Sequence, residues 1–245
     1  MRPPIPAIGF VAALSLAAGG YAQAGSLRIE PVLVDVAAPG AATTLTLQNT
    51  EEKAIEAQIR VFHWTQVAGK ESLEPTDDVV VSPPAATLAP NQQYVVRVVR
   101  VTKRPVAGEE SYRVLIDELP DAAASTNSRT VNLLVRQSVP VFFGQPQRSD
   151  ASLVWSVVGN GKSAAIVVTN NGDSRMRVAG LSIQPPGGKP ISFGNGLVGY
   201  VLGQSSMRWP VPGNNEHLAA GGSVSISALS EKGPIHALAQ VQQTE

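Results

Sequence analysis

Alternation of apolar and polar residues is the dominant pattern along the chain. It is clearest in residues 43–49 and 55–64, and residues 94–101 form a further run rich in valine. Because successive side chains of a strand point to opposite faces, this period of two predicts strands with one buried face. Residues 51–57 taken alone also fit a helix, but the β-branched and aromatic content that follows favours a strand.

Short strands bounded by turn-forming residues are expected throughout the rest of the chain. Further strands are predicted at residues 79–81, 112–117, 130–143, 153–158, 164–170, 176–183, 197–202, 223–228 and 237–241. A spacing of about 8–12 residues between strands is typical of β-sandwiches. The 22 Gly and 19 Pro residues, which disfavour helix interiors, agree with this all-β prediction.

A change of character after Phe143 indicates two domains. Residues 144–147, Gly-Gln-Pro-Gln, are the best linker candidate, and a second series of short strands follows them. Residues 121–129, rich in Ala, Ser, Thr and Asn, predict a mobile loop. We therefore expect two β-sandwiches in tandem, spanning residues 25–143 and 148–245.

The first 24 residues fit a secretory signal peptide. Arg2 precedes an apolar run at residues 8–18, and Ala22-Gln23-Ala24 fits an Ala-x-Ala cleavage site. The apolar run is shorter than the roughly 20 residues that span a bilayer, which favours a cleaved signal over an uncleaved anchor. We expect residues 1–24 to be removed and the mature chain to be exported. The lack of cysteine fits an oxidising compartment.

Composition and motifs argue against several functional classes. The 19 Lys+Arg balance 19 Asp+Glu, without the clustered cationic excess that nucleic-acid binding needs. The chain has no Cys, and its three His residues lack metal-ligand spacing. Gly194–Gly199 fits G-x-G-x-x-G, but a predicted strand follows it where a dinucleotide site needs a helix, so turn glycines are favoured. We expect no enzymatic activity, cofactor, metal ion, nucleic acid or small-molecule substrate.

One strand carries an apolar row with two interpretations. Val131, Leu133, Val135 and Val139 share one parity, and Gln137 is the polar member of that row. The row fits an ordinary core strand. It also fits an exposed edge strand that adds to the sheet of another chain, or that pairs with a second copy of this one. The pattern alone leaves both interpretations open.

The order of motifs is similar to that of the PapD-like periplasmic chaperones of chaperone–usher pilus assembly. The matching segments are Ser82-Pro83-Pro84, Leu88, Pro90, Val95-Val96-Arg97, Glu110-Ser111-Tyr112, Asp117-Glu118-Leu119-Pro120, Val139-Pro140-Val141-Phe142-Phe143, Gly199-Tyr200-Val201-Leu202-Gly203 and Arg208-Trp209-Pro210-Val211-Pro212. They run through nearly all of the mature chain and are most specific in its first domain.

This resemblance implies two immunoglobulin-like domains set at an angle, and a periplasmic chaperone that delivers pilus subunits to an outer-membrane usher. Subunits of such pili lack one strand, and the chaperone lends an edge strand until another subunit replaces it. Carried over by position, Val131, Leu133 and Val135 fill the subunit groove, and Val139 lies further along. The resemblance thus favours the donor strand over a core strand. The alternative is a secreted immunoglobulin-like structural or adhesive protein.

The sequence departs from the family pattern where the subunit's C-terminal carboxylate binds. The best-studied members use an Arg on the first strand and a Lys near the end of the last, positions that match Leu33 and Pro140 here. Neither residue binds a carboxylate, which needs a cation or several N–H donors. Arg113, on the strand beside the donor strand, is the first substitute, and Arg28 and Arg136 are further candidates.

Overall fold

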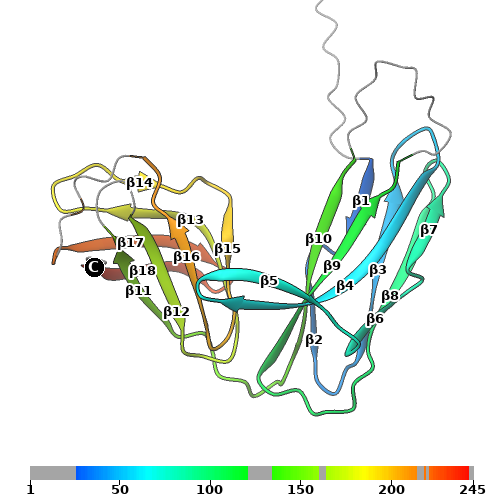
Figure 1. Cartoon of the computed structure of the whole chain (residues 1–245), viewed down its shortest axis with the longest axis horizontal. Coiled ribbons are helices and arrows are strands. Elements are labelled where there is room, and N and C mark those ends of the chain that lie inside the picture. Colours follow the sequence, from blue (N-terminus) through cyan, green and yellow to red (C-terminus); the bar gives the residue numbers. More distant parts are fainter. Residues whose placement is uncertain (1–25, 121–133, 160–163, 214–217, 219–220, 243–245) are drawn as a thin grey trace, which may run out of the picture.

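The computed structural model describes residues 26–120, 134–159, 164–213, 218 and 221–242 (Figure 1). Every regular element within these ranges is a β-strand, which confirms the all-β prediction. The described part therefore contains no helix long and apolar enough to cross a membrane. The predicted signal peptide, residues 1–24, and the predicted mobile loop, residues 121–129, lie outside the described residues.

The first domain is a sandwich of two sheets. One contains, in spatial order, β1 (Leu27–Glu30), β3 (Ala42–Asn49), β8 (Gln93–Arg100) and β6 (Val79–Ser82). The other contains, in spatial order, β2 (Val34–Ala37), β10 (Arg136–Gly144), β9 (Glu109–Glu118), β4 (Ile55–Val67) and β5 (Lys70–Pro75), with β7 (Ala85–Leu88) also paired to β4. Because β1 and β2 are consecutive, the chain crosses from one sheet to the other between Glu30 and Val34.

The second domain is built from one continuous set of strands. In spatial order these are β14 (Ile191–Ser192), β13 (Met176–Gln184), β17 (Ser223–Ser230), β18 (Gly233–Gln242), β11 (Leu153–Val158), β12 (Ala165–Asn170) and β16 (Ser205–Pro210), with β15 (Leu197–Val201) also paired to β13. The two domains are immunoglobulin-like and meet at an angle in Figure 1.

Each domain has its own core, and the alternating residues supply it. Leu45 and Leu47 of β3 are fully buried in the first core, and Leu181 and Ile183 of β13 are fully buried in the second. Burying one such side chain contributes about 1.5–3 kcal/mol. The period of two in the sequence therefore predicted the buried face of these strands correctly.

The predicted strands are present, with ends that shift by a few residues, and the helical alternative for residues 51–57 is wrong because β4 begins at Ile55. Six strands were not predicted, namely β1, β2, β5, β7, β14 and β16. Five of the six residues of β5 are exposed, so this strand has no buried face and leaves no alternating pattern. β10 ends at Gly144 and β11 begins at Leu153.

Two glycines of the G-x-G-x-x-G pattern, Gly194 and Gly199, have structural roles. Gly194 has φ 100°, a backbone conformation that L side chains rarely adopt. Gly199 lies within β15, and a Cβ there would lie 3.2 Å from the Trp209 ring. The pattern is therefore part of a turn and a packed strand, as the sequence predicted.

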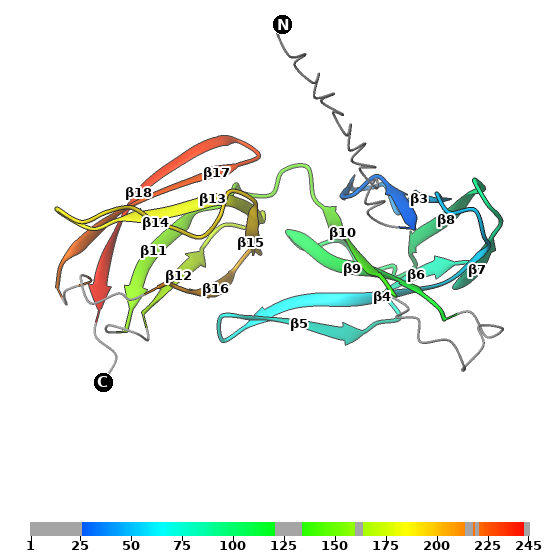
Figure 2. The same ribbon diagram turned by 90° about the horizontal axis from the view of Figure 1, so that it is seen from above.

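The hairpin formed by β4 and β5 extends from the first domain to the second (Figure 2). At its turn, the carbonyl oxygen of Gly69 accepts a hydrogen bond of 3.0 Å from the backbone N–H of Arg208. The Gln66 side chain donates to the carbonyl oxygen of Tyr200 at 2.8 Å and accepts from the backbone N–H of Leu202 at 2.9 Å. These bonds attach the hairpin to the edge of the second domain.

An aromatic cluster and a partly buried charge network complete the contact between the domains. We call this region the joint; its apolar part consists of Trp64, Phe142, Tyr200 and Leu202, with Leu33 packed against it. Its charged part consists of Asp35, Glu109, Arg148 and Arg175. Residues from both domains contribute to each part, so the joint is stabilised by apolar burial and by paired charges together.

Candidate functional site

Strand β10 pairs differently along its two halves. Val141–Gly144 lie between β9 and the parallel strand β2, so this half is bonded on both sides. Residues 136–140 pair with β9 alone among the described residues, because β2 begins only at Val34. One backbone edge of this half is therefore unpaired in the described structure. An unpaired edge is a template on which another extended chain forms a strand. We call residues 134–140 the open edge.

The predicted apolar row meets this edge only in part. Val131 and Leu133 lie outside the described residues. Val135 is half-buried at the start of the open edge. Val139 is 4% exposed and packs in the core of the first domain with Val141. Its side chain therefore fills this chain's own core and is unavailable to a partner.

Gln137, the polar member of the row, contacts the other sheet of the sandwich. Its side-chain amide donates a hydrogen bond to the carbonyl oxygen of Leu27 in β1. This contact joins the open edge of one sheet to the edge strand of the other, and a hydrogen bond from the Ser26 hydroxyl to the Glu118 carboxylate of β9 also links the two sheets. The polar residue in an apolar row is thus explained by a cross-sheet bond.

Arg136, one of the predicted anchors, is engaged within the domain. Its Nε donates to Oδ1 of Asp117, and Nη2 of Arg60 donates to Oδ2 of the same carboxylate at 2.5 Å. Desolvation raises the pKa of Asp117, but the hydrogen bonds from Arg136 and Arg60 outweigh it, and the pKa lies below its ordinary value. This carboxylate holds the beginning of β10 in register with β9, where Arg136 and Asp117 are direct partners.

Arg28, another predicted anchor, lies in β1 on the other sheet. Its side chain is 65% exposed, and Nη2 lies 2.5 Å from Oε1 of Glu30, which is also exposed. Such surface pairs contribute about 0–1 kcal/mol. Arg28 thus shares no sheet with Arg113 and Arg136, so the structure does not bring the three candidates together.

Arg113 has the strongest geometry of the candidates. It lies in β9 directly opposite Pro140, the position where the family pattern has its lysine. Its side chain is only 15% exposed, and the guanidinium lies 3.7 Å above the Trp64 ring and 5.8 Å from the Tyr200 ring. Desolvation lowers the pKa of this guanidinium, although the nearby carboxylate of Glu71 opposes the shift. A largely buried guanidinium beside the open edge is suited to bind an anionic ligand.

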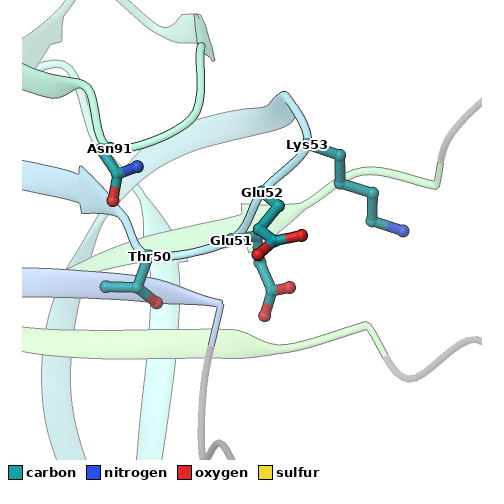
Figure 3. Close-up of a pocket in the computed structure, with 5 residues that line it drawn as sticks. All are labelled: Thr50, Glu51, Glu52, Lys53 and Asn91. Atoms are coloured by element: carbon teal, nitrogen blue, oxygen red, sulfur yellow. The ribbon is translucent and has the colours of Figure 1, made fainter.

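A polar pocket at the far end of β4 is lined by Thr50, Glu51, Glu52, Lys53 and Asn91 (Figure 3). The side chain of Lys53 points away from the others in this view. The turn is shaped from beneath by buried Asn49, whose amide donates to the carbonyl oxygens of Lys53 and Leu88 at 2.8 and 3.0 Å. Because these bonds account for the turn geometry, the pocket is a feature of the turn.

Sequence reasoning missed the residues that surround Arg113. Trp64 and Gln66 come from β4, Glu71 from β5, and Tyr200 from the second domain. Tyr200 belonged to a recognised motif, but nothing in its spacing indicated a contact with a residue 134 positions earlier, the separation of Gln66 and Tyr200. Pairing of β9, β4 and β5 within the first domain brings Trp64 and Glu71 to Arg113, and the meeting of the two domains adds Tyr200.

Comparisons with known proteins agree with this geometry. The family described as pili and flagellar-assembly chaperone, PapD N-terminal domain, matches residues 26–149. No curated protein sequence matches the chain significantly.

Solved structures show the same two-domain fold. The CsuC–CsuE chaperone–tip adhesion subunit pre-assembly complex of Acinetobacter baumannii matches with 24% identity and a TM-score of 0.67, covering 90% of this chain and 100% of that one. The Salmonella enterica SafA pilin complex with the SafB chaperone matches with 23% identity and a TM-score of 0.60, covering 87% and 96%. The Escherichia coli chaperone DraB matches with 21% identity and a TM-score of 0.57, covering 86% and 98%.

Proposed function

This chain belongs to the family of pili and flagellar-assembly chaperones, and from that premise we propose that it holds pilus subunits by lending them its open edge. The chaperone role follows from the family. The residues that carry it, the transfer of subunits to an outer-membrane usher, and export to the periplasm through a cleaved signal peptide are parts of the proposal. No step in it requires catalysis.

The observation that carries the proposal is the one-sided pairing of residues 136–140. A subunit strand added there forms main-chain hydrogen bonds along the edge, while alternate side chains enter its apolar groove. We assign that row to Val131, Leu133 and Val135 and leave out Val139, which is already buried in the first domain. Each groove-filling side chain contributes about 1.5–3 kcal/mol when fully buried.

We propose Arg113 as the residue that binds the C-terminal carboxylate of the subunit. It lies beside the open edge, its side chain is largely buried, and its carboxylate partner among the described residues is 3.6 Å away. Arg136 already donates to Asp117, and Arg28 is a solvated surface residue paired with Glu30. An arginine in a desolvated position, from which no carboxylate of the described residues accepts a hydrogen bond, is the better anion site.

The same edge supports two further expectations. In the absence of a subunit, two copies of the chain can pair through their open edges, which predicts a reversible dimer. A secreted structural or adhesive protein with this fold is the alternative function, but membership of a chaperone family favours the chaperone. The Acinetobacter and Salmonella structures named above contain a chaperone together with a pilus subunit, which also supports the assignment.

Co-expression with candidate pilus subunits from the same genome tests the proposal. The wild-type chain should co-purify with its subunit in a one-to-one complex. Replacing both Leu133 and Val135 with Asp should abolish that complex while leaving the two domains folded, as judged by circular dichroism. Leu134→Asp is the matched control, because Leu134 is 51% exposed and has the opposite parity. Survival of the complex in the double variant would show that this row does not bind the subunit.

A further inference from the structure

Within the described part of the chain, Arg113 is less completely paired with carboxylates than the buried Arg100 and Arg175. Arg100 Nε and Nη2 each lie 2.8 Å from an oxygen of Glu110, and Arg175 Nη1 lies 2.6 Å from Glu109. Arg113 Nη2 lies 3.6 Å from Oε1 of Glu71, which is beyond hydrogen-bond length. Among the described residues, no carboxylate accepts a hydrogen bond from Arg113. Of the described carboxylates, Glu71 lies near enough to offset the charge of Arg113, but without a hydrogen bond.

The Glu71 side chain lies where it can turn away from Arg113 into solvent. It lies in β5, an edge strand that pairs only with β4, two residues after the hairpin turn at Gly69. Its side chain is 41% exposed, against 15% for Arg113. A carboxylate that is well hydrated and not hydrogen-bonded to its partner is held weakly, because exposed ion pairs contribute about 0–1 kcal/mol. Turning Glu71 into solvent therefore costs little.

Arg113, in contrast, is fixed. Its guanidinium stacks on Trp64, which is 1% exposed, and Tyr200 of the second domain lies on the same cation. Stacking on aromatic faces keeps an arginine in one orientation. The cation thus remains in place whether or not Glu71 lies beside it.

We propose that Glu71 is an internal substitute for the subunit's C-terminal carboxylate: it neutralises Arg113 in the free chaperone and is displaced when the subunit binds. This inference rests on the proposed role of Arg113 as carboxylate anchor. In the free protein, Glu71 then keeps Arg113 from lying unpaired beside the joint. The C-terminal carboxylate of a subunit must compete with Glu71 for Arg113. Carboxylate affinity is set by the difference between the two pairings.

The test uses two probes that differ only in the anion. One is an acetylated hexapeptide of alternating threonine and valine with a free C-terminal carboxylate, and the other is the same peptide as the C-terminal amide. The indole N–H signal of Trp64 in the nuclear magnetic resonance spectrum reports binding, because Arg113 stacks on that ring. Titration of the full chain with each peptide gives two dissociation constants.

The wild-type chain should bind the carboxylate form more tightly than the amide. Glu71→Gln should raise affinity for the carboxylate form about two- to fivefold and leave the amide unchanged, as expected from removing a half-exposed ion pair. Glu74→Gln is the matched control, since it removes the same charge from the same strand at a position of opposite parity, facing away from Arg113. It should leave both affinities unchanged.

The outcomes separate this inference from the anchor on which it rests. If Arg113→Gln abolishes the preference for the carboxylate while Glu71→Gln leaves it unaltered, the anchor stands and the substitute role is wrong. Equal gains in Glu71→Gln and Glu74→Gln would mean that net charge alone matters, and would also overturn it. If the wild-type chain does not distinguish the two peptides, both the anchor and the substitute are wrong.

Discussion

Arg175 and Arg113 are similar buried arginines with opposite degrees of pairing. Both guanidinium groups lie 3.7 Å above an aromatic ring of the joint, Phe142 for Arg175 and Trp64 for Arg113. Arg175 also donates to Glu109 at 2.6 Å and to Asp35 at 2.8 Å, whereas Arg113 has one distant carboxylate. Burial and stacking therefore do not distinguish a structural cation from a binding cation. The distinction lies in whether a carboxylate of the described residues accepts a hydrogen bond from the guanidinium, as Glu109 does from Arg175.

The largest expected effect comes from removing Glu109, the carboxylate that pairs with Arg175 and Arg148. Glu109 is 1% exposed and lies between Arg175 and Arg148. Glu109→Ala should lower the free energy of unfolding by about 3–5 kcal/mol, because it removes the buried carboxylate that Arg175 and Arg148 share and leaves them only the more exposed Asp35. Urea denaturation followed by tryptophan fluorescence measures this. A loss below about 1 kcal/mol would show that the network is hydrated and contributes little to the joint.

Removing Arg113 should affect subunit binding strongly and stability only weakly. Arg113→Ala should weaken subunit binding by about 10- to 100-fold, the loss of a charged hydrogen bond, and should reduce stability by only about 1 kcal/mol through the lost stacking on Trp64. Calorimetric titration of the purified subunit and urea denaturation give the two quantities. Undiminished subunit binding would remove Arg113 as the anchor, and Arg28→Ala serves as the exposed-arginine control.

Gln66 tests how much an uncharged contact between the domains contributes beside the two arginines. Gln66→Ala removes a hydrogen bond to Tyr200 and one from Leu202, and leaves two buried backbone groups unpaired. We expect a loss of about 1–3 kcal/mol in unfolding free energy and a wider distribution of interdomain angles in small-angle X-ray scattering. If the scattering profile is unaltered, the charged network and the aromatic cluster are sufficient to hold the angle.

The smallest expected effect concerns the carboxylate beneath the open edge. The pKa of Asp117 is lower in the folded chain than in the unfolded one, so its stabilisation is present above the unfolded pKa and is lost as pH falls through the folded pKa. The free energy of unfolding should therefore decrease more steeply with acidification in the wild type than in Asp117→Asn. Parallel urea denaturations from about pH 6 to pH 3 check this. Parallel slopes would mean that Arg136 and Arg60 do not hold the carboxylate in solution.

Local patterns predicted much of the fold. Alternation located β3, β4, β8 and most later strands, because a half-buried strand requires a period of two. It could not reveal β5, whose residues are nearly all exposed, although this strand positions Glu71 and extends to the second domain. The ordered motifs in the sequence indicated the family, and the family match supports that identification.

The candidate site was predictable only in outline. The parity of residues 131–139 predicted one apolar row, but the sequence could not show that Val139 ends in the core while residues 136–140 leave a backbone edge unpaired. That division depends on where β2 begins, since only Val34–Ala37 covers β10 on its other side. Which strand pairs with β10 depends on where the chain crosses from one sheet to the other. Local composition and residue spacing do not show where that crossing lies.

The sequence by itself determined the all-β class, the buried faces of most strands and the absence of cysteine chemistry, because these follow from side-chain periodicity and residue type. The tertiary structure alone decided that Arg175 donates to two carboxylates, while the nearest carboxylate to Arg113 among the described residues lies 3.6 Å away. Arg113 and Arg175 have the same side chain, and they differ through partners contributed by β5, β9 and the second domain. Arg175 gains its carboxylate partners only once the two domains have met, whereas Glu71 reaches Arg113 through strand pairing within the first domain and Tyr200 through the second.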